Sequence, residues 1–116
     1  MGGFGTYREL DAWSLTYALC QRVYEITDGF PDSERFGLVT QMRRCAVSVP
    51  SNIAEGWGRR DRRDFNRFLR IAQGSLCELD TQTSLAQDFG YADDPGLSDE
   101  IRRCQRVIAG LMRSLQ

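Results

Sequence analysis

Four stretches of this chain repeat apolar residues at steps of three and four positions, the spacing that places side chains on one face of an α-helix. Prolines and glycines separate the stretches, and none of them alternates apolar and polar residues as a half-buried strand does. At 116 residues the chain can form one continuous core but not two ordinary ones. We therefore expect a single all-α domain over residues 1–116, folded as an antiparallel up-down four-helix bundle.

The first predicted helix runs from Tyr7 to about Thr27 and carries two adjoining apolar seams, more than one contact within a bundle requires. The first seam consists of Leu10, Trp13, Tyr17, Cys20 and Tyr24. The second seam consists of Ala12, Leu15, Leu19, Val23 and Ile26. A subunit interface could use the surplus apolar surface, and its candidate residues are Leu15, Leu19, Val23 and Ile26.

The second predicted helix begins at a cap formed by Asp32 or Ser33, includes Phe36 on its core face, and ends at residues 56–58. Pro50 lies in the middle of this segment. Because proline removes a backbone hydrogen bond and costs about 3 kcal/mol in an unkinked helix, we expect a kink near Pro50. Nearby polar side chains would help to satisfy the freed carbonyls, and the candidates are Ser48, Ser51 and Asn52.

The third and fourth helices have clear start signals. Asp61 is the predicted N-cap of the third helix, which ends at Gly90 and should be about 40 Å long at 1.5 Å per residue. Asp94 and Pro95 supply the cap and the first-turn proline of the fourth helix. Each helix contains one cysteine without a C-x-x-C pair, which favours small buried thiols over disulfides or a four-thiolate site. The four cysteines are Cys20, Cys45, Cys77 and Cys104.

The chain contains no histidine and no lysine, so all fifteen basic residues are arginines. This composition excludes Ser-His and Cys-His nucleophile activation, Schiff-base catalysis and the lysine of a P-loop. We therefore expect no enzyme, no cofactor and no metal site. The chain shows neither an export signal nor an apolar run of about 18 residues, which predicts a cytoplasmic, soluble protein without a membrane contact.

Positive charge is concentrated in one quarter of the sequence. Residues 43–70 hold eight arginines and three acids, a net charge of +5, whereas residues 1–42 and 71–116 each carry −3. Five of these arginines fall within about a 100° sector if the third helix extends back to Arg59. Phosphates could neutralise them, as could acids of the same or another protomer. The candidate nucleic-acid-binding residues are Arg43, Arg44, Arg59, Arg60, Arg63, Arg67 and Arg70.

Several polar and aromatic residues beside the arginines have alternative roles. Gln41, Asn52 and Glu55 are candidate motif or structural polar residues. Asn52 and Glu55 could bond to the kinked backbone, pair with an arginine or line a ligand pocket. Trp57 could stack on a base or close the end of the bundle.

Two acidic pairs are the remaining candidates for metal ligands. Asp61 and Asp64 fit the capping of a helix start better than a metal site. Glu78 and Asp80 are two positions apart and point to different faces of a helix.

A long motif in the second helix resembles the 23S rRNA intervening-sequence family. The resemblance rests on SERFGLVTQMRRCAVSVPSNIAEGWGRR, on the following FNRFLRIAQGSLCELDTQ and on the pair Gly90-Tyr91, and it extends from Tyr7 to the C-terminus. It implies an antiparallel four-helix bundle that assembles as a homopentamer and is not an enzyme. A related branch, the accessory variability determinants of diversity-generating retroelements, forms basic pentamers that bind nucleic acid and a reverse transcriptase. This chain differs from that branch in being slightly acidic overall.

Three functions compete at this point. The first is a homo-oligomeric scaffold that binds RNA, DNA or a nucleoprotein partner through the arginines. The second is a protein-interaction module in which the arginines form ion pairs within or between subunits. The third, least favoured, is a carboxylate-metal nuclease, because the usual bases and ligands are missing.

Overall fold

The computed structural model describes residues 5–116, which form four α-helices joined by short connections. The helices are α1 (Asp11–Asp28), α2 (Leu38–Gly58), α3 (Arg62–Asp88) and α4 (Pro95–Ser114). Two 3₁₀ turns, η1 (Tyr7–Glu9) and η2 (Asp32–Glu34), precede α1 and α2. The described residues contain no strand, so the expected all-α four-helix bundle is confirmed.

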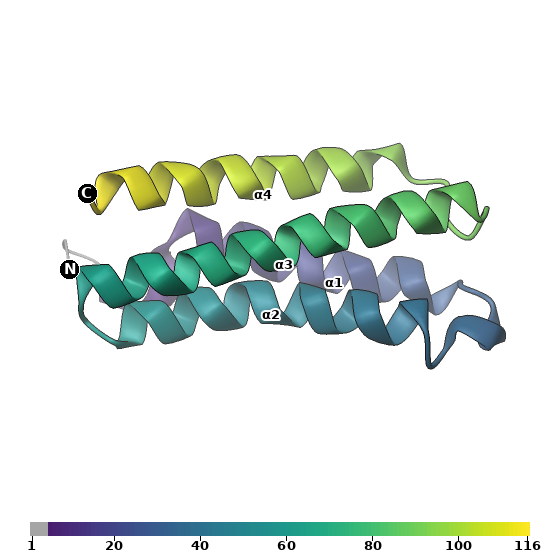
Figure 1. The fold of residues 1–116 in the computed structure, drawn as a ribbon, viewed down its shortest axis with the longest axis horizontal. Helices are drawn as coiled ribbons and strands as arrows, with labels where there is room; N and C mark the ends of the chain where they lie inside the picture. Colours follow the sequence, from purple (N-terminus) through teal and green to yellow (C-terminus); the bar gives the residue numbers. More distant parts are fainter. Residues whose placement is uncertain (1–4) are drawn as a thin grey trace.

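The four helices lie side by side along the long axis of a molecule that measures 45 × 22 × 19 Å (Figure 1). Each helix contacts two neighbours: α2 packs on α1 and α3, and α4 packs on α1 and α3. The contact between α2 and α3 is the most extensive. Figure 1 also shows the α2–α3 turn and the C-terminus at one end of the bundle, and the other two connections at the opposite end.

The first two helices start later than the sequence predicts. Thr6 caps η1 by accepting a hydrogen bond from the Arg8 backbone N–H (3.2 Å), and extended backbone at Leu10 delays α1 to Asp11. Phe36 lies outside α2 and is 87% exposed, so its expected place on the core face is wrong. Gly37 breaks the helical conformation just after it, with φ −108° and ψ −107°.

Pro50 is buried and lies inside an uninterrupted α2. The Asn52 side chain donates hydrogen bonds to the backbone oxygen (2.7 Å) and the hydroxyl (2.9 Å) of Ser48, which supports the helix next to the proline. The Ser48 hydroxyl also pairs with that of Ser75 on α3 (2.9 Å). The kink near Pro50 stays a prediction.

The predicted caps of α3 and α4 are confirmed. The Asp61 carboxylate accepts a hydrogen bond from the Asp64 backbone N–H (2.9 Å), and the Asp94 carboxylate accepts one from that of Gly96 (3.1 Å). Pro95 is the first residue of α4. Gly90 ends the α3 region with a left-handed φ of 78°, a conformation that glycine adopts without steric cost.

The two apolar seams of α1 share the core, because Leu10 of the first seam is buried as well as Leu19 and Val23 of the second. Leu19 and Val23 are 1% and 0% exposed in the protomer's own core, and Leu15 and Ile26 pack against that core. Leu19 and Val23 are therefore not available for the proposed subunit interface, whereas the half-buried Leu15 and Ile26 stay candidates for it. Among the residues of α1, Leu19 and Val23 lie in the core, whereas Tyr17 and Tyr24 of the first seam, which have a polar end, lie at the surface.

The cysteines divide into buried and accessible thiols. Cys45 and Cys104 are buried, as expected, and burial raises the pKa of the Cys104 thiol to about 11. Cys20 is half-buried, and Cys77 is exposed, so the expectation of burial is wrong for Cys77. All four are free thiols.

None of the helices in residues 5–116 combines the length and the apolar character that crossing a membrane requires.

A forked ion pair ties α1 to the start of α4. The Arg22 guanidinium contacts the Asp94 carboxylate at 2.6 Å and the Glu100 carboxylate at 2.7 Å. The hydrogen bond from Arg22 is the main reason why the pKa of Asp94 lies below its ordinary value of 3.8. A carboxyl with a lowered pKa stabilises the fold above its ordinary pKa, and the stabilisation is lost as the pH falls through the lowered value.

We predict that Asp94→Asn, which keeps a capping side chain, lowers the free energy of unfolding by less than about 1 kcal/mol near neutral pH. Asp94→Ala should cost about 1 kcal/mol more, because the cap is lost as well. Urea unfolding followed by circular dichroism at several pH values measures both differences. The Asn deficit should begin to shrink near pH 3.8, where the carboxyl of the unfolded wild-type chain takes up a proton, and should disappear below the lowered pKa of the folded state. A deficit that is independent of pH would contradict the role of the ion pair.

Candidate nucleic-acid interface

Six arginines gather where α2 turns into α3, and we call this group the arginine corner. Its members are Arg59, Arg60, Arg62, Arg63, Arg67 and Arg70. The helical register does not extend back to Arg59, as the predicted stripe required, because Arg60 has a left-handed φ of 55° and Asp61 is extended. Arg59 and Arg60 thus belong to a turn, and only the other four lie on α3.

Few carboxylates lie close enough to neutralise this positive charge. Arg59 pairs with Glu55 at 3.3 Å and Arg67 with Asp64 at 3.8 Å, and both pairs are solvent-exposed. Exposed pairs of this kind contribute about 0–1 kcal/mol. Within the described part of the chain, the remaining four arginines of the corner have no carboxylate oxygen within 4.0 Å. Six arginines less the acids Glu55, Asp61 and Asp64 leave the corner at +3.

Aromatic rings lie under three of the corner's guanidinium groups. Arg59 and Arg67 lie over the Phe68 ring, at 5.2 and 4.5 Å from its centroid. Arg60 lies over Trp57 at 4.9 Å. Trp57 is only 8% exposed and meets Tyr7 edge-on, with the centroids 6.4 Å apart. It therefore helps to close the end of the bundle, one of its two expected roles, and supports Arg60 from below.

A shallow depression of about 450 Å³ opens beside the corner. Four arginines, Asn66 and Leu115 line it, so it lies between the start of α3 and the end of α4; the arginines are Arg62, Arg63, Arg67 and Arg70. The first turn of a helix adds unpaired backbone N–H groups and a partial positive charge. Guanidinium groups also bind phosphate oxygens in pairs. The depression therefore suits a phosphate group chemically.

Arg43 and Arg44 lie elsewhere. Arg43 donates hydrogen bonds to the Thr27 hydroxyl (2.9 Å) and to the backbone oxygen of Tyr24 (3.3 Å). It therefore ties α2 to the C-terminal turn of α1. Arg44 is exposed. Fifteen residues separate Arg44 from Arg59, a distance of about 22 Å along a helix. The structure therefore divides the seven candidate arginines between two places.

The polar motif residues do not converge on one site either. Gln41 is exposed near the start of α2, Asn52 bonds to Ser48, and Glu55 pairs with Arg59. Asp61 acts as a helix cap, and Glu78 accepts a bond from the Cys45 thiol (3.6 Å). Across residues 5–116, no group of three or more acidic or cysteine side chains is arranged to hold a metal ion.

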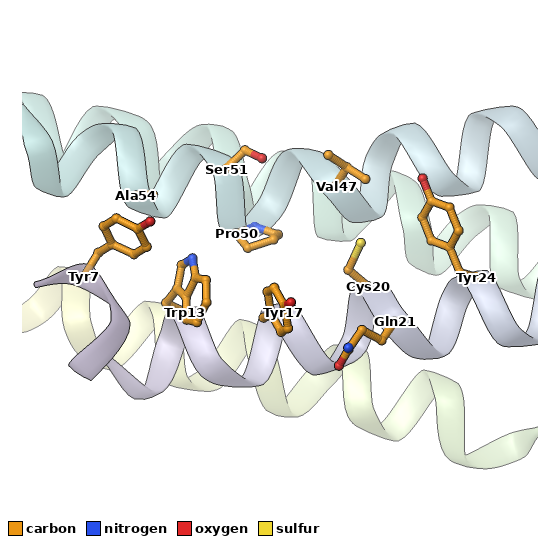
Figure 2. A pocket seen from close by; sticks show the side chains of 10 residues that line it. All are labelled: Tyr7, Trp13, Tyr17, Cys20, Gln21, Tyr24, Val47, Pro50, Ser51 and Ala54. Atoms are coloured by element: carbon orange, nitrogen blue, oxygen red, sulfur yellow. The ribbon is translucent and has the colours of Figure 1, made fainter.

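Sequence reasoning missed two features. Arg62 was outside the predicted sector, although its position directly after the cap Asp61 could have marked it as part of the corner. The second feature is a groove of about 630 Å³ between α1 and α2. Figure 2 shows Trp13 and Tyr17 projecting from α1 toward Pro50 of α2. The periodicity had placed this aromatic seam in the core.

Gly56 sets the distance between the helices behind the corner. A Cβ atom at this position would lie 2.7 Å from the Cβ of Phe68 and 3.0 Å from a ring carbon of Phe65. Backbone of α2 therefore packs directly on aromatic side chains of α3, and this contact holds the two ends of the turn together.

Comparison with known families gives one match. The model of the family described as 23S rRNA-intervening sequence protein matches residues 8–113. The search of curated proteins found no match.

We predict that Gly56→Ala lowers the free energy of unfolding by about 1–3 kcal/mol, the usual cost of forcing an extra carbon into a packed contact. Gly58→Ala is the matched control, because it changes the same helix where no atom lies within 4 Å of the added carbon. The control should be neutral or up to about 1 kcal/mol more stable, since alanine favours helix. Urea unfolding measures both, and equal effects at the two positions would contradict the close contact.

Proposed function

The chain belongs to the 23S rRNA-intervening sequence protein family, and on this basis we propose that it is a non-enzymatic homo-oligomeric scaffold that binds a nucleic acid or nucleoprotein through the arginine corner. The observation that carries the proposal is the set of exposed arginines without a neighbouring carboxylate, chiefly Arg63 and Arg70. Phosphates would relieve their mutual repulsion, and the bound arginines would displace condensed counterions from the nucleic acid.

The arrangement of the corner favours an extended polyanion over a single small anion. Arg62, Arg63 and Arg70 extend over nine residues of helix, a rise of about 12 Å, with Arg60 contributed by the turn. Phosphates in one strand of a duplex follow each other at about 3.4 Å of helix rise, so several could meet the corner together. Most contacts of this kind bind the backbone and carry no sequence information.

The absence of enzyme activity is proposed from residue types. Without histidine and lysine, the chain lacks the side chains that most often serve as general base, nucleophile or imidazole ligand near neutral pH. A protein of this composition can still position a nucleic acid for a partner that supplies the chemistry.

Self-association, as a homopentamer, is the second part of the proposal. Of the four α1 candidates, Leu19 and Val23 are buried in the protomer and contribute no surface, which leaves Leu15 and Ile26. Exposed apolar side chains lie at the end of the bundle opposite the arginine corner, where α2 begins and α3 ends: Phe36 is 87% exposed, Phe89 57% and Leu85 42%. Burial of these side chains against other copies would leave the arginines accessible.

A protein-interaction module without nucleic-acid binding is the alternative. It is favoured by the arginines that are already bonded within the chain: Arg43 to Thr27, Arg59 to Glu55 and Arg67 to Asp64. On this alternative the remaining arginines would pair with acids of another subunit, and charge reversal would dissociate the oligomer.

We predict that the double variant Arg63→Glu with Arg70→Glu weakens nucleic-acid binding at least tenfold. It should also lower the slope of log affinity against log salt by about two, one for each lost phosphate contact. The matched control is Arg35→Glu with Arg103→Glu, two exposed arginines outside the corner. Each double variant changes the formal net charge from −1 to −5 (−1 − 4), so the control accounts for overall charge. Fluorescence anisotropy of labelled RNA and DNA between about 50 and 200 mM salt measures both.

Light scattering of the same variants separates the two functions. Loss of binding with an unchanged oligomer mass supports the scaffold proposal. Dissociation of the corner variant but not of the control supports the interaction module instead. The nucleic-acid proposal is wrong if the wild-type protein binds neither RNA nor DNA at low salt, or if both variants bind as the wild type does.

A further inference from the structure

The groove between α1 and α2 presents an aromatic surface, although Tyr7 and Trp13 also pack against the core on their inner side. Trp13 and Tyr17 are stacked at a centroid distance of 4.8 Å and an angle of 28°. Tyr7 joins Trp13 at 5.4 Å, and Tyr24 lies farther along the same side of α1. Tyr17 and Tyr24 are 47% and 42% exposed. Figure 2 shows these rings along one wall of the groove, with Val47, Pro50 and Ala54 of α2 along the other.

A series of ring contacts that passes through the buried Trp57 connects the groove with the arginine corner. Arg60 of the corner covers Trp57, Trp57 meets Tyr7, and Tyr7 meets Trp13, which stacks on Tyr17. Each step in this series is a ring or cation contact of 6.4 Å or less. The groove therefore starts at the positively charged end of the bundle and continues along α1.

Arginines also lie at both ends of the groove itself. Arg8 lies over the Trp13 ring at 5.0 Å and over the Tyr7 ring at 5.5 Å. At the other end, Arg43 lies over the Tyr24 ring at 4.5 Å. None of the ten described residues that line the groove is acidic. The groove thus combines an apolar, aromatic floor with positive charge at its ends.

Hydrogen-bonding groups are available beside the rings. Gln21 and Ser51 line the groove and are exposed. Their amide and hydroxyl groups can donate to and accept from the polar edge of a base, while a neighbouring ring supports its face.

Resting on the nucleic-acid binding proposed above, we infer that this groove binds the bases of a single-stranded nucleic acid by stacking, with the phosphates held by Arg8, Arg43 and the arginine corner. Stacking platforms flanked by positive charge are the usual way in which proteins hold single strands, because every base has a flat apolar face. Trp13 and Tyr24 are eleven residues apart, which gives a length of about 16 Å and room for several bases.

Charge favours this occupant over a second copy of the chain. The protein is slightly acidic, with a formal net charge of −1, yet no acid lines the groove and arginines lie at its ends. Contact with an apolar face of another copy would place those arginines at the interface without negatively charged groups to pair with. A single strand offers flat apolar bases and one negative charge for each nucleotide.

The test compares single-stranded RNA with the duplex of the same length by fluorescence anisotropy. The wild-type protein should prefer the single strand. Tyr17→Ala should weaken single-strand binding by roughly five- to 150-fold, the range expected for loss of one stacked base, and should leave duplex binding unchanged. Tyr17→Phe keeps the ring and should bind as the wild type does. Ile71→Ala removes a 42% exposed apolar side chain that lies outside both the groove and the proposed subunit contact, and it should have no effect.

Tryptophan fluorescence supplies a second measurement. The chain has two tryptophans, Trp13 in the groove and Trp57 below Arg60. A single strand stacked on the groove should quench the emission of Trp13, so Trp13→Phe should lose most of the quenching while it keeps an aromatic platform and its affinity. Circular dichroism and light scattering establish that each variant keeps its fold and its oligomer mass.

The outcomes separate this inference from the proposed function. The groove inference is wrong if Tyr17→Ala binds single strands as the wild type does while the Arg63 and Arg70 double variant does not, and the function of the corner then stands. It is also wrong if Tyr17→Ala changes the oligomer mass, because the groove is then a contact between copies. Absence of binding to any nucleic acid overturns both proposals.

Discussion

The close contact between α2 and α3 at Gly56 is the constraint on which the charged end of the molecule depends. With no side chain at this position, the α2 backbone meets Phe65 and Phe68 directly, and a turn of three residues, Arg59 to Asp61, joins the helices. The end of α2 and the start of α3 therefore lie together. Arg59 is favoured by the negative end of the α2 dipole, whereas Arg62 and Arg63 oppose the positive end of α3. An anion would offset that opposition.

The fold was largely predictable from the sequence, because local rules and tertiary packing agree over most of the chain. Asp61, Asp94 and Gly90 act at the helix ends as their chemistry predicts. The predictions were wrong where one residue overrides a pattern. Gly37 leaves the helical conformation and places Phe36 in solvent, and Arg60 adopts a left-handed conformation that moves Arg59 out of the α3 register.

The candidate site was predicted in composition but not in arrangement. Charge counts located the arginine-rich segment, since such counts need no geometry. They could not separate Arg43, which bonds to Thr27, from Arg63, which has no carboxylate nearby, because that difference depends on which helices meet. The unequal burial of the α1 residues has the same cause. Periodicity shows that both seams are apolar, but which side chains are buried depends on how α1 packs against α2 and α4, and Leu19 and Val23 are buried whereas Tyr17 is not.

The left-handed conformation of Arg60 strains the backbone of the turn but places a positive charge there. A residue with a side chain at φ 55° stores strain of about 1 kcal/mol or more, which glycine would remove. Selection for stability alone would favour glycine at this position, as it does at many helix ends. The arginine at this position keeps a cation above Trp57, but its backbone is more strained than that of a glycine. Replacing Arg60 with glycine to raise the thermal stability would therefore remove a positive charge from this end of the bundle.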